Sequence, residues 1–335
     1  MKNSMNDSYI LHIIETNDEN EIELLFAQAR KVREEHYGKS VYIRGLIEIS
    51  NYCVNDCYYC GLRCSNKNLE RYRNSLQDII ECCSTGEKLG IKTFVLQGGE
   101  DPWFTAERVI EIVSAVREKF PDHAITLSIG ERSESDYRDF FKAGTNRYLL
   151  RHETALDSHY AKLHPPKQKF SDRMNCLRIL KKIGYQTGAG FIAGSPYQTP
   201  ESLLSDIRFL EELQPQMIGI GPFLPQKDTP FGNQPAGSLT LSLKMLALCR
   251  LALPKALIPA TTAMETITPN GREMALNAGA NVVMPNLSPA NQKKLYAIYD
   301  NKATGSGEAA ENLSILKEKI IKAGYIPDMS RGDAK

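Results

Sequence analysis

Four cysteines within twelve positions are the first residues with clear chemical meaning. Cys53, Cys57, Cys60 and Cys64 are separated by three, two and three residues. Thiolates on a short loop are the usual ligands of iron–sulfur clusters. Three ligands on a four-iron cluster leave one iron open, and an open metal position can bind a small molecule directly. The spacing therefore predicts metal chemistry centred on this loop.

Zinc is the alternative use of clustered thiols. Structural zinc sites combine two Cys-x-x-Cys pairs, or one such pair with histidines. Here Cys57 and Cys60 form one pair, Cys53 lies one position too far for a second, and no histidine is near. Cys64 would close a four-thiolate site, and for an open cluster we expect it to be a free thiol. The predicted metal ligands are Cys53, Cys57 and Cys60.

Composition describes an ordinary globular chain. It has 335 residues, 42% apolar and 24% charged, with a net charge of +1. No electrostatic footprint of a nucleic-acid partner is present. No apolar run approaches the roughly 20 residues of a membrane helix, and no targeting segment is visible. We expect a cytoplasmic protein with no membrane or nucleic-acid partner, in which Cys82, Cys83, Cys176 and Cys249 are small buried side chains of helices.

The cysteines follow the first of eight expected strands, which alternate with helices. The strands are predicted at residues 41–49, 93–96, 124–129, 147–150, 187–192, 217–220, 257–261 and 281–284. Helices are predicted at residues 75–89, 106–120, 134–143, 172–183, 201–213, 239–253 and 271–278. Ser75 with Asp78 resembles a capping box, and Thr199-Pro200-Glu201 is a typical helix start.

Eight strand–helix units predict an α/β fold, a (β/α)8 TIM-type barrel. A doubly wound open sheet is the alternative, but it would usually place Gly-x-Gly-x-x-Gly after the first strand. We expect residues 1–40 to form an N-terminal helical extension and residues 41–335 to form the barrel, with a further helix near the C-terminus.

The motif Cys53-x-x-x-Cys57-x-Tyr59-Cys60 resembles the signature of the radical S-adenosylmethionine (SAM) superfamily, with Tyr59 in the aromatic place. The resemblance implies a [4Fe–4S] cluster whose open iron binds SAM. It also implies reductive cleavage of SAM to methionine and a 5′-deoxyadenosyl radical. The three cysteines would then be the catalytic residues.

Further segments fit a SAM site. The stretch 97–100 resembles the superfamily's glycine-glycine-glutamate motif, which binds the methionine amine; a simple glycine turn is the alternative. An arginine and an acid after the fourth strand, with an arginine on the next helix, would suit the zwitterionic end of SAM, or form a structural salt bridge. The cofactor-binding residues expected are Tyr59, Gln97, Gly98, Gly99, Glu100, Thr126 and Ser128 (toward the ribose), Arg151, Glu153, Arg173, and Ile192 (toward the adenine).

The whole chain resembles the HydE type of [FeFe]-hydrogenase maturase. The most specific stretches are residues 59–63, 95–97, 148–154, 219–223, 258–264 and 284–286. This resemblance implies assembly of the hydrogenase H-cluster, other maturases and an electron donor as partners, and a small-molecule or organometallic substrate. The substrate proposed for the family is a cysteine-bound iron carbonyl cyanide complex delivered by a partner maturase.

A substrate pocket is expected beside the SAM site. Thr261 and Thr262 would end the seventh strand, Met284 the eighth, and Tyr296 and Tyr299 would follow on the next helix. Core packing is the alternative for the two tyrosines, which would share one helix face.

Three other functions compete with this interpretation. No cysteine follows Cys249, so we expect a single cluster. Biotin synthase needs a second cluster with ligands on strands, and no predicted strand here carries a cysteine. A radical mutase of the methylornithine synthase type is closer. A zinc-stabilised binding protein without catalysis is the alternative from another class.

Overall fold

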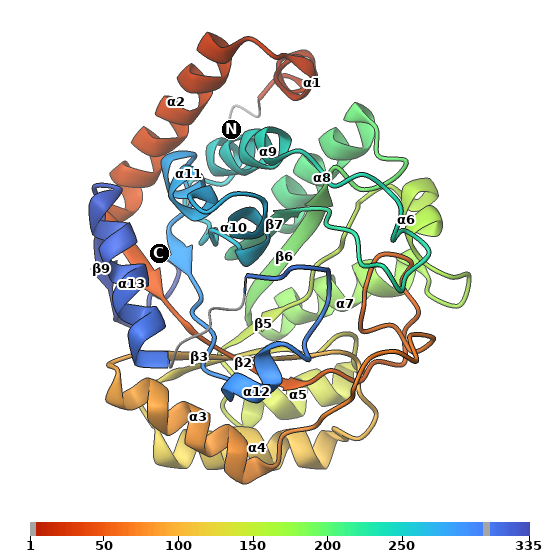
Figure 1. Cartoon of the computed structure of the whole chain (residues 1–335), viewed down its shortest axis with the longest axis vertical. Coiled ribbons are helices and arrows are strands. Elements are labelled where there is room, and N and C mark those ends of the chain that lie inside the picture. Colours follow the sequence, from red (N-terminus) through yellow and green to blue (C-terminus); the bar gives the residue numbers. More distant parts are fainter. Residues whose placement is uncertain (1–4, 304–308) are drawn as a thin grey trace.

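The computed structural model of the chain describes residues 5–303 and 309–335 and shows a parallel β-barrel surrounded by helices (Figure 1). Six strands form one parallel sheet in sequence order, and three more form a second sheet in the order β8-β1-β9. The strands are β1 Ser40–Ile43, β2 Gly45–Ser50, β3 Thr93–Gly98, β4 Ala124–Ser128, β5 Arg147–Leu149, β6 Gln186–Ala193, β7 Met217–Pro222, β8 Val282–Val283 and β9 Ile326–Asp328.

Backbone hydrogen bonds between the two sheets close the barrel. The amide of Ile218 in β7 donates to Leu257 (3.0 Å), and Ala260 donates to Val282 in β8 (2.8 Å). On the other side of β8, the amide of Arg44 donates to Val283 (3.0 Å), and Leu46 in β2 donates to Pro285 (2.9 Å). The predicted TIM-type barrel is therefore confirmed.

Two predicted strands differ in detail from the structure. The strand expected at 257–261 is reduced to isolated bridges at Leu257 and Pro259, because the chain turns at Thr261 into a helix. The strand expected at 41–49 is divided into β1 and β2 at Arg44. This residue's buried guanidinium donates to the sulfur of Met217 (3.2 Å) and to the carbonyl of Gly332 (3.1 Å).

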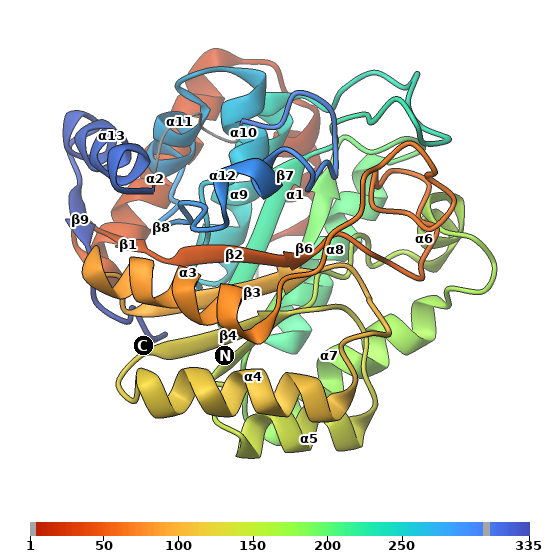
Figure 2. The same cartoon turned by 60° about the horizontal axis from the view of Figure 1, so that its bottom comes forward.

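Helices cover the outer face of the barrel (Figures 1 and 2). Both predicted helix starts are correct, since Ser75 forms a capping box with Asp78 and Thr199 caps the helix that Pro200 begins. The helices are α1 Asp7–Glu15, α2 Glu19–Tyr37, α3 Leu76–Lys88, α4 Ala106–Lys119, α5 Glu134–Lys142, α6 Asp157–Leu163, α7 Phe170–Ile183, α8 Pro200–Leu213, α9 Leu239–Ala252, α10 Thr262–Ile267, α11 Gly271–Asn277, α12 Ala290–Lys293 and α13 Ala309–Lys322.

The N-terminal helices pack on the barrel's own helices, α1 on α8 and α2 on α9. This arrangement agrees with the expected helical extension, while its boundary at residue 40 stays a prediction. None of the helices in the described residues combines the length and apolar character that a membrane span requires.

Strand geometry sorts side chains between the core and the barrel interior, because alternate residues point to opposite faces. In β2, Ile47 and Ile49 belong to the main hydrophobic core, whereas Leu46 and Glu48 line a cavity inside the barrel. The strands therefore deliver polar groups to the interior without breaking the outer core.

The C-terminal segment covers the end of the barrel where β1 begins, and its strand β9 was not predicted from the sequence. Strand β9 pairs in parallel with β1. Beyond it, Asp333 forms an ion pair with the fully buried Arg147 (2.7 Å) and accepts a hydrogen bond from Gln186 (2.9 Å). Burial alone would raise the pKa of Asp333, but the hydrogen bonds from Gln186 and Arg147 outweigh it and lower that pKa to about 2.

The first prediction concerns this ion pair. Asp333→Asn should lower the free energy of unfolding of the apoprotein by about 1–2 kcal/mol at pH 7, because it removes the charge paired with a buried guanidinium. The pKa is lower in the folded state, so the carboxylate stabilises the fold above its unfolded pKa of about 3.9. That contribution disappears as the pH falls toward 2. Urea unfolding at several pH values measures both effects.

Asp139→Asn is the matched control. Asp139 pairs with Lys142 on the exposed face of α5, so its loss should change stability by less than about 0.5 kcal/mol. Equal effects of the two substitutions would show that the Arg147 pair contributes nothing specific.

Candidate active site

The cysteine loop, residues 51–74, leaves β2 at the carboxyl end of the barrel strands (Figure 2). It contains no helix and only a single bridging residue, so its backbone groups need other partners. Arg71 supplies several, since its guanidinium donates to the carbonyls of Asn51, Leu62 (2.9 Å), Arg63 (2.8 Å) and Asn66 (3.1 Å). The loop is therefore folded around one side chain.

Three of the loop's four clustered cysteines face the same cavity. Cys53, Cys57 and Cys60 line a space of about 350 Å³ inside the mouth of the barrel, and Cys64 is not among its lining residues. The backbone amide of Cys64 donates a hydrogen bond to the carbonyl of Asn55 (2.9 Å), which fixes the position of Cys64 in the loop. The geometry thus separates Cys64 from the three other cysteines, and the role of those three as metal ligands stays a prediction.

The three thiols are buried and weakly supported by hydrogen bonds. Burial raises the pKa of Cys57 to about 12 and also raises those of Cys53 and Cys60. Gln168 donates its amide to the sulfur of Cys57 (3.4 Å). A bound metal reverses this rise in the thiol pKa, because its positive charge favours the deprotonated thiolate that coordinates it.

Among the described residues, no group of three or more His, Cys, Asp or Glu side chains is arranged around a single metal ion. In a four-iron cluster each thiolate binds its own iron, so its ligands stand further apart. The donor set of three thiols on one cavity wall fits a cluster with one open iron.

The glycine motif after β3 packs directly against the cysteine loop. A Cβ atom at Gly99 would lie 2.2 Å from the carbonyl oxygen of Tyr52 and 2.8 Å from the Cβ of Cys53. The amide of Val54 donates to the carbonyl of Glu100 (2.9 Å). A side chain at position 99 would therefore collide with the cysteine loop. Glycine here allows the two protein segments to touch, in addition to the ligand approach that we expected from the sequence.

A network of charges joins the glycine motif to α7. The Arg173 guanidinium lies 3.6 Å from the Glu100 carboxylate and 2.5 Å from that of Glu131, and it donates to the carbonyl of Arg151 (2.8 Å). Burial raises the pKa of Glu100, and the charge of Arg173 opposes that shift. Glu131 was not predicted from the sequence, because nothing in the sequence signals its pairing with an arginine 42 residues away.

Arg151 and Glu153 lie after β5 and form a second ion pair in the cavity wall, at 3.2 Å. Glu153 has a positive φ of 67°, which is unusual for a residue with a side chain. Its turn is fixed by Asp206, which accepts hydrogen bonds from the amide of Ala155 (2.5 Å) and faces His152 (3.2 Å). Strained backbone of this kind is typical of functional sites.

The structure gathers most of the predicted residues but not all. Three of them, Thr126, Ser128 and Tyr296, are not among the residues that line the cavity. The others that line it besides the cysteines are Tyr59, Gln97, Gly98, Gly99, Glu100, Arg151, Glu153, Arg173, Ile192, Thr261, Thr262, Met284 and Tyr299. Tyr296 lies just behind the wall, where its hydroxyl accepts a hydrogen bond from Gln97 (3.2 Å). The roles of all these residues stay predictions.

Two local expectations about the substrate residues are wrong. Thr261 and Thr262 do not end a strand: Thr261 precedes α10 at the N-cap position, without a capping hydrogen bond from its side chain, and Thr262 begins the helix. Tyr296 and Tyr299 do not share a helix, because α12 ends at Lys293 and both lie in the following segment. The Thr261 hydroxyl is buried without a hydrogen-bond partner in the described part of the chain, whereas Thr262 accepts one from Arg272 (3.2 Å).

Sequence analysis missed an ion pair in the cavity between Glu48 of β2 and Lys302. The Lys302 ammonium contacts one oxygen of the Glu48 carboxylate, and Asn286 donates to the other (2.8 Å). Burial raises the pKa of Glu48, against the influence of Lys302. The sequence did offer one sign of this ion pair, a carboxylate within the apolar stretch 46–49. A charge on a buried strand requires a partner, because an unpaired buried charge is costly.

Comparison with known proteins agrees with this site. The family model for the radical SAM superfamily matches residues 47–210. The [FeFe] hydrogenase maturase subunit HydE of Thermotoga maritima is 47% identical over 286 residues, which are 85% of this chain and 81% of that protein. The chain therefore belongs to the radical SAM superfamily, as an enzyme homologous to the HydE maturase.

Another branch of the superfamily is also similar. The 3-methylornithine synthase of Methanosarcina barkeri is 34% identical over 281 residues, which are 83% of this chain and 79% of that protein. A crystal structure of methylornithine synthase (PylB) superposes with a TM-score of 0.87 at 29% identity, covering 97% of this chain and 94% of that one. Membership of the superfamily decides against the zinc-stabilised binding protein.

The superfamily's cofactors are a [4Fe–4S] cluster and SAM. When bound, the reduced cluster supplies the electron that cleaves SAM to methionine and a 5′-deoxyadenosyl radical. Cys53, Cys57 and Cys60 would hold the cluster, and the charged groups of Glu100, Arg151 and Arg173 at the cavity wall would hold and orient SAM.

The second prediction separates Cys64 from the three cavity cysteines. After anaerobic reconstitution, Cys64→Ser should keep about four irons per chain, whereas Cys57→Ser should lose most of them, because Cys57 faces the cavity and Cys64 does not. Iron and sulfide analysis with absorption spectra measures this. Loss of iron in Cys64→Ser would make Cys64 a ligand.

The third prediction concerns Arg71. Arg71→Gln should leave the barrel folded but reduce cluster occupancy severalfold, because several hydrogen bonds from a charged donor, each contributing about 1.5–3 kcal/mol, are lost from the loop. Iron content and far-ultraviolet circular dichroism are compared with those of Arg178→Gln. Arg178 is exposed on α7 and pairs with Glu212, so iron loss in that control would show that the effect is not specific to the loop.

Proposed function

We propose that this enzyme acts in assembly of the [FeFe]-hydrogenase H-cluster in the cytoplasm, on a cysteine-bound iron carbonyl cyanide precursor. Other maturases that deliver and receive this material, and a one-electron donor, are its proposed partners. The observation that carries the proposal is the 47% identity to the HydE maturase over most of both chains, which exceeds the identity to methylornithine synthase.

The cavity supports a substrate with both polar and soft groups. Beyond the cysteines it is lined by the unpartnered hydroxyl of Thr261, the thioether of Met284 and the phenol of Tyr299. Burial raises the pKa of Tyr299 to about 12, so its hydroxyl stays protonated and can donate a hydrogen bond. Sulfur and hydroxyl groups of this kind suit a metal complex better than they suit a purely apolar ligand.

Charged groups in the same cavity suit the amino-acid part of such a precursor. A cysteine ligand carries a carboxylate and an amine. Arg151 and Lys302 offer cations, and Glu48 and Glu153 offer acids, in two pairs on the cavity wall. A bound zwitterion can exchange partners with these pairs without leaving a buried charge alone.

The fourth prediction tests the function by genetic complementation. Deleting the gene should abolish hydrogenase activity, the wild-type gene should restore it, and Cys57→Ala should not, because the variant lacks a cluster ligand. Cys64→Ser is the matched control and should restore activity. Full hydrogenase activity in the deletion strain would contradict the maturase assignment, and formation of 3-methylornithine by the purified enzyme would favour the mutase alternative.

A further inference from the structure

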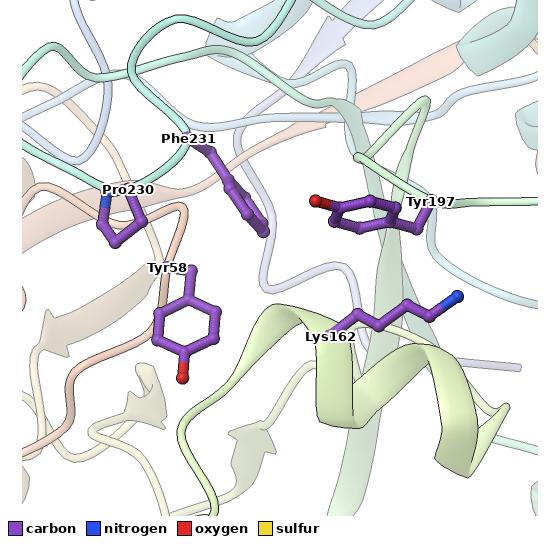
Figure 3. A pocket seen from close by; sticks show the side chains of 5 residues that line it. All are labelled: Tyr58, Lys162, Tyr197, Pro230 and Phe231. Atoms are coloured by element: carbon purple, nitrogen blue, oxygen red, sulfur yellow. The ribbon is translucent and has the colours of Figure 1, made fainter.

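A second, shallow hollow lies on the outer side of the cysteine loop (Figure 3). Its walls are Tyr58, Lys162, Tyr197, Pro230 and Phe231, and it encloses about 500 Å³. The three aromatic rings face a common space, and the Lys162 side chain runs along its edge. We call this feature the aromatic hollow. It belongs neither to the cavity nor to any function described above.

Backbone hydrogen bonds attach the aromatic hollow to the cysteine loop. The amide of Phe231 donates to the carbonyl of Tyr58 (3.1 Å), and the amide of Tyr58 donates to that of Leu163 at the end of α6 (3.0 Å). The rings of Tyr58 and Phe231 meet edge to face with centroids 5.9 Å apart. The hollow is thus a fixed part of the structure that carries Cys57.

Tyr197, at the rim of the hollow, has an unfavourable backbone conformation. It is 59% exposed, and its φ of 63° lies in the left-handed region that favours glycine. Such a conformation costs on the order of 1 kcal/mol or more for a residue with a side chain. The ring meets Phe231 edge to face (centroids 6.2 Å apart), and its centroid lies 5.4 Å from the Lys162 ammonium. The strained backbone therefore holds the ring beside the hollow, where its exposed face is available for contact with another molecule.

The rim of the aromatic hollow is basic. Lys162 lies at its edge, and Lys167 and Lys169 follow in the segment after α6. All three are exposed, and none of them forms an ion pair with a carboxylate in the part of the chain that the structure describes. The Lys167 ammonium donates to the carbonyl of Val54 in the cysteine loop (3.1 Å). Two acids in the adjoining loops are already engaged. Asp56 pairs with Arg63 (2.6 Å), and Asp228 accepts a hydrogen bond from the amide of Asn68 (2.8 Å).

The location of the aromatic hollow beside the cysteine loop suggests what binds there. The inner side of the cysteine loop faces the cavity, so an electron for the cluster must arrive from the outer side. There Tyr58 adjoins Cys57, and Val54, which adjoins Cys53, is 43% exposed. We propose that the aromatic hollow and its three lysines are the docking site of an acidic protein that carries a single electron.

In this step the donor loses one electron and the cluster gains it, and no bond forms or breaks. Aromatic side chains in a central depression with charges at the rim are typical of protein interfaces. A small contact area suits the transient encounters of redox partners. Unpaired lysines at the rim accelerate association with an acidic partner, and salt weakens the attraction.

The fifth prediction uses the reconstituted holoenzyme and a reduced low-potential ferredoxin with an acidic surface as the probe. Lys162→Glu should lower the second-order rate constant of cluster reduction about tenfold at low ionic strength, and the difference should shrink at high salt. Binding of the oxidised ferredoxin should weaken in parallel. Tyr197→Gly should also weaken binding, and glycine adopts the φ of this position without strain.

Two controls make the test specific. Lys31→Glu makes the same charge change on α2, on the opposite side of the barrel from α6 (Figure 1), and should retain the wild-type rate. Cluster reduction and SAM cleavage driven by dithionite should be unchanged in every variant, which separates docking from the radical chemistry and from the proposed maturation function.

Three results would overturn the proposal. One is equal ferredoxin binding and reduction rates in the wild type and Lys162→Glu. Another is an equal loss in Lys31→Glu, which would indicate only a general effect of charge. The last is a variant that binds ferredoxin normally but loses affinity for a partner maturase or for a second copy of the chain.

Discussion

The Arg71 guanidinium and the carbonyl groups around it are the interaction on which this site depends. The segment between β2 and α3 carries all three thiols that line the cavity, yet it has almost no regular backbone pairing. Peptide groups without partners would cost more than the loop gains from its few buried side chains. Arg71 satisfies several of them at once, and the contacts of Val54 and Gly99 then align the loop with the end of β3.

Charges inside the barrel mouth occur in pairs, and this pairing explains why the cavity can be both polar and stable. Glu100 and Glu131 share Arg173, Arg151 faces Glu153, and Glu48 faces Lys302. Isolated charges at these depths would shift their pKa values and become neutral. Contacts between opposite charges lower the cost of burying them and can still rearrange around a ligand, which suits substrates with opposite charges.

Local patterns in the sequence were sufficient for much of this architecture. The capping box at Ser75 and the strand–helix rhythm each depend on neighbouring residues, and the structure agrees with them. The ligand roles inferred from the cysteine spacing stay predictions. The errors concern interactions between distant segments. The strand expected at 257–261 is reduced to bridges because the chain turns into α10 at Thr261, and β9 was missed because its partner, β1, lies at the other end of the chain. No periodic pattern links Glu48 with Lys302.

The contact between Glu48 and Lys302 also sets an order of events in biogenesis. The two residues are 254 positions apart, so one wall of the cavity is missing until nearly the whole chain has left the ribosome. Contacts between such distant segments form late in folding because the connecting loop must first lose its entropy. A nascent barrel that already displays its cysteines is therefore still open at this wall.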